Sequence, residues 1–379
     1  MIVLGVTEKN KIFLVVTGLE PGGAERQVVD LADQFARFGF EVAIIVLSGC
    51  VVISPQLESI NIINLNLKKT PISVLSCLLK LRSLIAEHSP VVVHSHMYHA
   101  NIFCRLVKVL GFNFLLVNSA HSSNEGGRVR MLVYRYTSKL CDYFTNVGND
   151  AVESFIAKGA ARKNSIFPVR NGINLENYHL FARQDKLVLR ETLFGVTNED
   201  CFIFMMLARL APEKNLFNAL DAVRELCVRT KNFRLFIVGN GPLLEELMAY
   251  SRTLGVDKYA EFMGYRSDVS QLLGGADSLV LSSDYEGLPI SVGEAMASGL
   301  PVISTDCGGV SELISPEFLV PVRDPVALSH TMYELMLLNR EERKRIGFAN
   351  RCTMEQNFGL KAIAESWVDT YKKIGCKII

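Results

Sequence analysis

The sequence predicts an α/β protein made of two doubly wound units, each a parallel sheet covered by helices. Short apolar runs alternate with helical stretches throughout the 379 residues. The runs are continuously rather than alternately apolar, which is typical of strands buried on both faces of a parallel sheet. The alternation is interrupted after Val169 and then restarts, and a chain of this length is expected to form two or three domains.

The composition excludes several classes of protein. With 49% hydrophobic residues the chain can bury sizeable cores, which excludes a disordered chain. No apolar run approaches the roughly 18 residues that span a bilayer, and residues 1–17 lack a signal-peptide pattern. The nine cysteines include no Cys-x-x-Cys pair, which argues against a disulfide framework and a zinc ribbon. We therefore expect a cytoplasmic protein.

Charge is divided unevenly along the chain. Residues 1–170 hold 18 Lys and Arg against 12 Asp and Glu, a net charge of +6, and the remainder holds 22 against 27, a net charge of −5. No extended basic run is present, so nucleic-acid binding is only weakly indicated. Attraction of the first half to an anionic membrane or a phosphorylated substrate stays open.

The first unit begins with a strand, a glycine-rich turn and a helix. Its expected strands are 11–18, 41–47, 61–65, 91–94, 114–117 and 143–147. Its expected helices are 24–38, 74–87, 101–110 and 128–139. These segments predict the first doubly wound sheet.

The second unit follows a turn at residues 170–173 and a polar stretch, 174–186, that we interpret as a linker. Its expected strands are 202–207, 234–239, 260–264, 278–282 and 301–304. The expected helices that follow the linker are 216–229, 243–254, 290–298, 325–338, 340–357 and 360–374. Two such units facing each other predict a ligand cleft at the carboxyl ends of both sheets.

The motif DYEGLPISVGE carries the strongest chemical signal. A strand ends just before it, and Pro289 is expected at the first position of a helix, where its missing N–H costs nothing. The amides of Gly287 and Leu288 then lie at a helix N-terminus, which favours anions. Glu286 can point into the cleft, and Glu294 can accept hydrogen bonds from hydroxyls such as those of a ribose. An ordinary helix N-terminus with solvated acidic residues is the alternative.

Arg209 and Lys214 follow the expected strand 202–207 and precede the next helix. In this position they can neutralise a diphosphate, the arginine through paired hydrogen bonds and the lysine as a point charge. Two surface charges on a loop are the alternative. No Asp-x-Asp occurs in the chain, so no obvious carboxylate pair would hold a magnesium ion against a diphosphate. We therefore expect protein cations, and no metal, to neutralise a leaving diphosphate.

Glycine-rich turns follow three further strands. Gly22 and Gly23 stand between the first strand and the first helix, where the backbone can approach a phosphate or a sugar. Gly239 and Gly241 form a second turn, and Gly308 belongs to a third. None of these turns is Gly-x-Gly-x-x-Gly, so a dinucleotide-dependent dehydrogenase is disfavoured.

Histidines gather near two strand ends of the first unit. His94, His96 and His99 are conceivable zinc ligands, but no acidic or cysteine partner stands at ligand spacing, so a polar sugar-binding rim is favoured. His121 begins a glycine-containing loop that we expect to face the cleft. A structural histidine with both ring nitrogens satisfied is the alternative for His121.

The segment 128–139, RVRMLVYRYTSK, combines basic, apolar and aromatic residues on one expected helix. A helix of this kind can lie on an anionic membrane surface. A helix that covers the sheet and leaves its arginines in water explains the pattern equally well.

The ordered set of these motifs resembles the retaining, nucleotide-sugar-dependent glycosyltransferases of family 4, which have the GT-B fold of two facing Rossmann-like domains. The set consists of Gly22-Gly23-Ala24-Glu25, Arg209 with Lys214, Gly239-Asn-Gly241-Pro242, Glu286 with Glu294, and Gly308-Gly309. It spans almost the full chain. The stretches HSHMYHANI and HSSNEGGRVR further resemble bacterial transferases that build lipopolysaccharide O-antigen, capsule or related surface polysaccharides.

The resemblance implies a division of labour between the domains. Residues 1–172 would form the acceptor-binding domain and residues 173–358 the donor-binding domain. A crossover helix within 359–379 would pack back on the first domain.

The resemblance also implies roles for individual residues. The catalytic residues would be His121, Arg209, Lys214 and Glu286. The donor would be bound by Gly22, Gly23, Arg209, Lys214, Gly239, Gly241, Glu286, Gly287, Leu288 and Glu294. The acceptor would be bound by His96, Asn101, His121 and Asn124. Neither a metal nor a cofactor is implied.

The implied reaction moves a hexose or N-acetylhexosamine from a nucleotide sugar, with UDP favoured, to a hydroxyl of a glycan. The acceptor would be lipid-linked, for example through undecaprenyl diphosphate, and the enzyme would work in the cytoplasm, in peripheral contact with the inner membrane. A GT-B nucleotide-sugar epimerase or hydrolase that needs no acceptor is one alternative. A non-catalytic carbohydrate-binding scaffold is the other.

Overall fold

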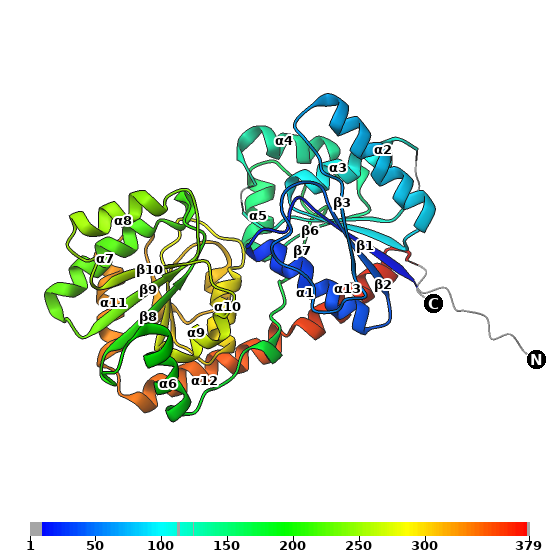
Figure 1. Cartoon of the computed structure of the whole chain (residues 1–379). Coiled ribbons are helices and arrows are strands. Elements are labelled where there is room, and N and C mark those ends of the chain that lie inside the picture. Colours follow the sequence, from blue (N-terminus) through cyan, green and yellow to red (C-terminus); the bar gives the residue numbers. More distant parts are fainter. Residues whose placement is uncertain (1–9, 112–113, 124, 377–379) are drawn as a thin grey trace, which may run out of the picture. The chain divides into compact units, whose positions relative to one another are not determined.

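The continuous apolar runs of the sequence form the centres of two parallel sheets (Figure 1). This computed structural model describes residues 10–111, 114–123 and 125–376. The chain divides into two units, the first made of Met1–Gly172 with Leu360–Ile379 and the second of Ile173–Gly359. Each sheet is covered by helices on both faces, which confirms the predicted class of two doubly wound α/β units.

The first sheet has the strand order β3-β2-β1-β4-β5-β6-β7, with every neighbouring pair parallel. Its strands are β1 (Lys11–Val16), β2 (Glu41–Val46), β3 (Asn61–Asn64), β4 (Val92–His96), β5 (Leu116–Ser119), β6 (Tyr143–Asn146) and β7 (Phe167–Pro168). The direction of winding reverses between β1 and β4. In doubly wound sheets the loops at such a reversal are where ligands bind.

Helices cover both faces of the first sheet. One face packs against α1 (Gly23–Arg37) and α13 (Leu360–Lys373), which lie beside each other although they stand at opposite ends of the chain (blue and red in Figure 1). The other helices of this unit are α2 (Pro71–His88), α3 (Tyr98–Val109), α4 (Gly127–Thr137) and α5 (Asn149–Ala157), with the 3-10 turn η1 (Ser138–Leu140) after α4. Trp367 and Tyr371 of α13 are buried in the core of the first unit.

The second sheet has the order β10-β9-β8-β11-β12-β13, again all parallel. Its strands are β8 (Phe202–Leu207), β9 (Phe233–Val238), β10 (Ala260–Gly264), β11 (Ser278–Leu281), β12 (Val302–Thr305) and β13 (Leu319–Val320). Here the winding reverses between β8 and β11. The loops that follow these two strands are therefore neighbours at the carboxyl edge of the sheet.

Helices also cover both faces of the second sheet. The main core lies between the sheet and α7 (Leu216–Arg229), α8 (Leu244–Thr253) and α11 (Pro325–Leu337). The other helices of the unit are α6 (Arg183–Phe194), α9 (Val269–Gly275), α10 (Ile290–Ala297) and α12 (Arg340–Asn357). Four short 3-10 turns complete the unit: η2 (Leu175–Asn177), η3 (Pro212–Lys214), η4 (Gly308–Glu312) and η5 (Pro316–Phe318).

All eleven predicted strands are present, but several other predictions were wrong. Helices α5, α6 and α9 and the two-residue strands β7 and β13 were not predicted. The linker prediction for 174–186 fails at Arg183, where α6 begins; Arg190 is the one buried residue of this polar helix, and it pairs with Asp277 rather than with an apolar surface. The helix expected at 101–110 begins already at Tyr98, and Pro289 caps α10 from outside instead of occupying its first position.

The unit boundaries differ from the predicted segments 1–172, 173–358 and 359–379 by one residue. Gly359 forms an isolated parallel bridge with Ile173 and belongs to the second unit. Residues 377–379 of the predicted crossover segment lie outside the described residues.

In the part of the chain that the structure describes, no helix combines the length and the apolar character needed to cross a membrane.

Candidate active site

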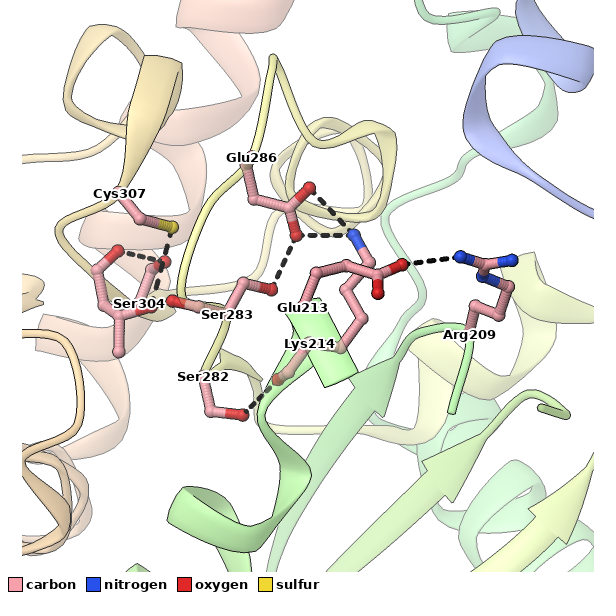
Figure 2. A network of polar contacts seen from close by, with 9 residues as sticks. Arg209, Glu213, Lys214, Ser282, Ser283, Glu286, Ser304 and Cys307 are labelled. Atoms are coloured by element: carbon pink, nitrogen blue, oxygen red, sulfur yellow. Dashed lines mark hydrogen bonds and ion pairs between the residues drawn. The ribbon is translucent and has the colours of Figure 1, made fainter. Parts of the chain in front are cut away.

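The loops after β8 and β11 bring together the charged residues that the sequence singled out. Arg209 and Lys214 lie in the loop after β8, and Glu286 lies in the loop after β11. Figure 2 shows their side chains in one polar network. The position agrees with the rule that ligands of doubly wound sheets bind at the reversal of strand order.

Lys214 and Glu286 form the centre of this network. The Nζ atom of Lys214 lies 2.6 Å from Oε1 and 2.8 Å from Oε2 of Glu286. The hydroxyl of Ser283 donates a third hydrogen bond to Glu286 Oε1, at 2.6 Å (Figure 2). Glu286 is only 7% exposed, so its charge depends on these partners rather than on water.

Backbone contacts fasten the two loops to each other. The hydroxyl of Ser282 donates to the carbonyl oxygens of Lys214 and Asn215, both at 3.0 Å. The amide of Asp284 donates to the carbonyl of Glu213 at 2.9 Å. Lys214 and Glu286 are therefore held at a fixed separation by main chain as well as by their own ion pair.

Asp284 adds a second clamp on the same loops. Its carboxylate accepts hydrogen bonds from the side-chain amide of Asn215 at 2.7 Å and from the guanidinium of Arg323. The hydrogen bond from Arg323 is the main cause that lowers the pKa of Asp284. The carboxylate is thus kept charged, and its hydrogen bonds connect the loop after β8 with the turn before α11.

Arg209 lies at the open side of the network. Its guanidinium pairs with Glu213 at 2.6 Å, and 62% of its side chain is exposed. Burial alone would raise the pKa of Glu213, but the hydrogen bond and charge of Arg209 outweigh it and lower that pKa. Arg209 and Lys214 are therefore each paired with a carboxylate.

Close backbone approaches explain the glycines of the network. Gly308 has a φ of +57°, and a Cβ atom there would lie 2.2 Å from the carbonyl oxygen of Glu286. Gly239 has a φ of +139°, and a Cβ atom there would lie 2.0 Å from the carbonyl oxygen of Ala208. A Cβ atom at Gly241 would lie 2.3 Å from the carbonyl oxygen of Leu210. These glycines allow neighbouring turns to support the backbone that carries Glu286 and Arg209.

The start of α10 carries the remaining predicted donor residues. The amides of Gly287 and Leu288 donate to no other described residue, whereas the carbonyl of Gly287 accepts from Gly309 at 2.9 Å. Inside the helix, Glu294 accepts a hydrogen bond from the hydroxyl of Tyr178 at 2.6 Å. The arrangement offers two unpaired N–H groups beside an anchored carboxylate, which suits an anion or a sugar hydroxyl.

The glycine-rich turn of the first unit lies at the reversal point of the other sheet. Gly22 caps α1 and Gly23 is its first residue, directly after the turn that follows β1. Gln27, one turn later, is 2% exposed, and its Oε1 atom accepts a hydrogen bond from the amide of Gly172 at 2.8 Å. This contact ties the start of α1 to the end of the first segment of the unit.

Three of the predicted histidines lie next to one another: His94 and His96 are buried, and His121 is partly buried. His96 is the last residue of β4, and its Nδ1 atom lies 3.0 Å from Nε2 of His121, which follows β5. Burial lowers the pKa of His121 to about 4 and holds that of His96 well below its usual range. Both rings are therefore neutral near pH 7.

Asn101 is not exposed at all, although the sequence analysis placed it at the acceptor. Its Oδ1 accepts from the hydroxyl of Ser95 at 2.7 Å, and its Nδ2 donates to the carbonyl of Ser119 at 2.9 Å. Asn101 thus joins β4 to β5 behind the histidines. Asn124, the fourth predicted acceptor residue, lies outside the described residues.

The geometry argues against a zinc site at the histidines. Both ring nitrogens of His94 are engaged, Nδ1 with the hydroxyl of Tyr371 and Nε2 with that of Ser119, each at 2.7 Å. His99 lies in the first turn of α3 and is exposed. Over the described ranges, no three His, Cys, Asp or Glu residues are grouped so that they could hold a metal ion.

Several residues of the network escaped the sequence analysis. Ser283 could have been found, because it stands two residues after the buried strand β11 and three residues before Glu286. Asn215 stands beside Lys214 but gave no signal of its own. Arg323 and Tyr178 stand far from their partners in sequence, so no local pattern connects them to Asp284 and Glu294.

Both halves of the chain match known domain families. Residues 21–177 match the model described as Glycosyltransferase Family 4, and residues 193–351 match the model described as Glycosyl transferases group 1. One similar protein is the UDP-Gal:alpha-D-GlcNAc-diphosphoundecaprenol alpha-1,3-galactosyltransferase of Escherichia coli, at 27% identity over 252 residues. That match covers 64% of this chain and 64% of the relative, so it spans less than two thirds of the relative's length.

Longer matches extend over most of the chain. The putative glycosyltransferase EpsF of Bacillus subtilis is 25% identical over 326 residues, which cover 79% of this chain and 80% of that protein. The crystal structure of Anabaena Alr3699/HepE in complex with UDP-glucose aligns with a TM-score of 0.83 at 19% identity. The alignment covers 96% of this chain and 99% of that one. At this identity the structural likeness shows a shared fold, the GT-B architecture.

Proposed function

Because the chain belongs to the glycosyltransferases, with a family 4 domain in its first half and a group 1 domain in its second, we propose that it is a retaining, metal-independent sugar transferase. The donor is a UDP-linked hexose or N-acetylhexosamine, and the acceptor is a hydroxyl of a lipid-linked glycan in bacterial surface-polysaccharide synthesis. The observation that carries the proposal is the Lys214–Glu286–Ser283 cluster at the reversal point of the second sheet.

The donor is bound by the second unit in this proposal. Its diphosphate replaces the carboxylates that now pair with Arg209 and Lys214, so that both cations face phosphate oxygens. Glu286 and the free amides of Gly287 and Leu288 receive the sugar and the neighbouring phosphate. Glu294 receives the ribose hydroxyls, and Gly239 and Gly241 allow the backbone to approach the donor.

The chemistry needs stabilisation of a leaving UDP. Negative charge grows on the diphosphate as the bond between the sugar and the diphosphate breaks, and Arg209, Lys214 and the amides before α10 stabilise this charge. A diphosphate oxygen takes the proton of the acceptor hydroxyl on the same face of the sugar, so the anomeric configuration is retained. No side chain is assigned as general base, and no divalent ion or cofactor takes part.

The acceptor is bound by the first unit, where His121 and His96 lie at neighbouring strand ends. Among the described residues, seven buried side-chain polar atoms have no hydrogen-bond partner, and four of them lie near the carboxyl edge of the first sheet. The four are Thr17 Oγ1, Gln27 Nε2, His96 Nε2 and His121 Nδ1. Buried polar atoms normally find a partner, so such a group suits a polyhydroxylated ligand. The undecaprenol in the name of the Escherichia coli relative supports a lipid-linked glycan.

Helix α4 provides a surface for peripheral contact with the cytoplasmic face of a membrane. Met131 and Tyr134 pack inward, while Val129, Leu132 and Tyr136 are 75%, 48% and 79% exposed. A groove of about 520 Å³ beside the end of α4 is lined by three basic residues, Arg135, Lys139 and Arg162, and one acidic residue, Asp142. Exposed apolar side chains beside cations favour an anionic lipid surface.

The test is a transfer assay with the full chain. UDP-hexoses and UDP-N-acetylhexosamines are offered with undecaprenyl-diphosphate-linked N-acetylglucosamine, and the anomeric configuration of the product is read by NMR. Arg209→Ala and Lys214→Ala are expected to lower kcat by about 10²–10³-fold each, because each removes one group that stabilises the leaving diphosphate. Arg224 on α7 is an exposed arginine that also pairs with a carboxylate, that of Glu225. Arg224→Ala therefore serves as the matched control and is expected to keep full activity.

Three results would contradict parts of this proposal. Near-normal turnover in both variants would remove the diphosphate role of Arg209 and Lys214. Loss of activity in EDTA with recovery on manganese alone would refute metal independence. Conversion of a UDP-sugar without any acceptor would point to an epimerase or hydrolase. If the protein bound no nucleotide sugar at all, the result would favour the non-catalytic carbohydrate-binding scaffold.

A further inference from the structure

The two predicted site histidines of the first unit are hydrogen-bonded to each other. His96 Nδ1 and His121 Nε2 lie 3.0 Å apart, with ring centroids 5.3 Å apart and an interplanar angle of 37°. The two outer ring nitrogens, His96 Nε2 and His121 Nδ1, are buried and have no partner in the described part of the chain. Each ring is thus satisfied on its inner side and unsatisfied on its outer side.

A structural histidine would use both of its nitrogens, and His94 shows the difference. Its Nδ1 pairs with Tyr371 and its Nε2 with Ser119. Its ring lies against that of His96, with centroids 4.1 Å apart. The ring of His94 is therefore held in place and packs against the ring of His96. The His96–His121 pair, by contrast, has two ring nitrogens that can bind a ligand.

Proton counting couples the two free nitrogens. A neutral imidazole carries one N–H, and burial keeps the pKa of both rings low, to about 4 for His121. The shared hydrogen bond uses the N–H of one ring and the lone pair of the other. If His121 donates to His96, its Nδ1 is an acceptor and His96 Nε2 is a donor; if His96 donates, both roles are reversed. The outer nitrogens always form one donor and one acceptor.

The main chain of His121 is fixed independently of its ring. The carboxylate of Glu125 accepts the amide of His121 at 2.8 Å and the hydroxyl of Tyr134 at 2.5 Å. With its backbone held by Glu125, the ring of His121 can still rotate about χ1 and χ2, and the hydrogen bond with His96 restricts both torsions. The ring of His96 is 1% exposed, whereas His121 is only partly buried, so His121 lies closer to the surface of the unit.

We propose that His96 is a positioning residue that acts through His121. Its hydrogen bond fixes the plane of the His121 ring and couples the tautomers of the two rings. His121 Nδ1 then donates to or accepts from the ligand hydroxyl, and His96 takes the matching tautomer. The inference rests on the proposed function, since His121 is placed at the reaction only there. It changes the role of His96 from a residue that touches the acceptor to one that orients the residue that does.

Two substitutions separate these roles. The side-chain amide of His96→Asn stands where Nδ1 of the imidazole stood and can still bond His121, whereas the amide of His96→Gln reaches the position of Nε2. We expect His96→Asn to keep kcat within about 3-fold of the original, and His96→Gln and His96→Phe to lose about 100-fold with little change in donor KM, because a misplaced reacting group costs about that much. His99→Asn, on the exposed side of α3, is the matched control.

Each other outcome overturns the proposal. Activity in His96→Gln with loss in His96→Asn would mean that Nε2 touches the ligand directly. Equal activity in all three variants, or equal loss in all three with unchanged melting temperature, would mean that the bond to His121 is not what matters.

A spectroscopic measurement tests the bond without any turnover. With ¹⁵N-labelled histidine, the full chain should show a scalar coupling between one nitrogen of His96 and one of His121, which disappears in His96→Phe and in His121→Ala. Its absence from the original protein would overturn the inference. Its presence in a protein that transfers no sugar would overturn the proposed function and leave the positioned pair intact.

Discussion

The ion pair of Lys214 with Glu286 joins two residues that stand 72 positions apart and that the sequence alone assigned to different parts of a donor. Glu286 is buried and Lys214 retains some contact with water, with side-chain exposures of 8% and 22%. Loss of the lysine therefore strands a charge in the interior, whereas loss of the carboxylate leaves an ammonium that water can reach.

This asymmetry predicts unequal effects on stability. Lys214→Met should lower the free energy of unfolding by about 3 kcal/mol, the low end for a stranded buried charge, because Ser283 still donates to Glu286. Glu286→Gln should cost about 1 kcal/mol, the loss of one hydrogen-bonded partner. Urea titrations of the single variants and of the double variant measure both terms. Equal costs for the two single variants would show that Glu286 is better hydrated than its burial indicates.

Asp30 on α1 predicts a dependence of stability on pH. Burial raises its pKa from 3.8 to about 6, against the opposing charge of Arg26. Because the folded state binds this proton more tightly than the unfolded state, its contribution is fully present below pH 3.8 and is lost as the pH rises through 6. At pH 8 the ionised carboxylate then costs about 3 kcal/mol.

Asp30→Asn removes this titration. Relative to the original protein, the variant should gain about 2–3 kcal/mol of stability between pH 4 and pH 8, measured by urea unfolding at each pH. Asp257→Asn, an exposed carboxylate in the second unit, is the control and should show no such trend. A pH-independent difference for Asp30→Asn would mean that the carboxyl group is not desolvated.

At the scale of elements, α12 touches the turn after α10 backbone to backbone. A Cβ atom at Gly347 of α12 would lie 1.8 Å from the carbonyl oxygen of Gly299. Main chain cannot rotate away as a side chain can, so Gly347→Ala must separate the two segments. We expect a loss of about 3 kcal/mol in the free energy of unfolding, the upper part of the range for overpacked sites.

The neighbouring position supplies the control for this prediction. Phe348 is 62% exposed on the same helix, so Phe348→Ala should change stability little. Because α10 carries Glu294, the Gly347→Ala protein should also bind UDP more weakly under the proposed function. Calorimetry and a UDP titration measure the two effects, and an unchanged melting temperature in Gly347→Ala would contradict the close contact.

The elements that the sequence predicted are those whose signal is local. Runs such as residues 12–16 and 202–206 are apolar throughout and could only be central strands. Strands β7 and β13 are two residues long and exist through pairing with β6 and β12, so their own residues carry no signal. Helix α6 was missed because its one buried residue is an arginine, Arg190, which interrupts the apolar pattern that marks most helices.

The site followed the same division. Arg209, Lys214 and Glu286 could be predicted because each lies in a loop that follows a strand, and such loops meet at one edge of a parallel sheet. The partners that hold them depend on which strands become neighbours. The contact of Arg323 with Asp284 and that of Tyr178 with Glu294 join segments 39 and 116 positions apart, and spacing contains no information about such pairs.

At the scale of the whole chain, the first unit depends on a helix from the other end of the sequence. Leu360, Ala364, Trp367 and Tyr371 of α13 belong to the core that α1 and the first sheet share. The hydroxyl of Tyr371 also holds His94. The second unit is one continuous segment, Ile173–Gly359, and takes no core residue from elsewhere in the described chain.

Deletion of residues 360–379 should therefore weaken one unit and spare the other. Loss of a buried tryptophan alone costs about 3–5 kcal/mol, so hydrogen exchange should accelerate in β1, β2 and β4 while β8 and β9 keep their protection. Trp367→Ala in the intact chain should show the same pattern to a smaller degree, and Lys372→Ala on the exposed side of α13 should not. Uniform acceleration across both sheets would contradict the independence of the second unit.

This dependence sets an order of events on the ribosome. When the first 172 residues emerge, the helix that completes their core has not yet been synthesised, and the apolar surface against α1 stays open to chaperones and to aggregation. The second unit is one continuous segment, so its last residue, Gly359, is added before the helix that completes the first unit. The unit made first is thus completed last, and a stalled or truncated product displays an unfinished core.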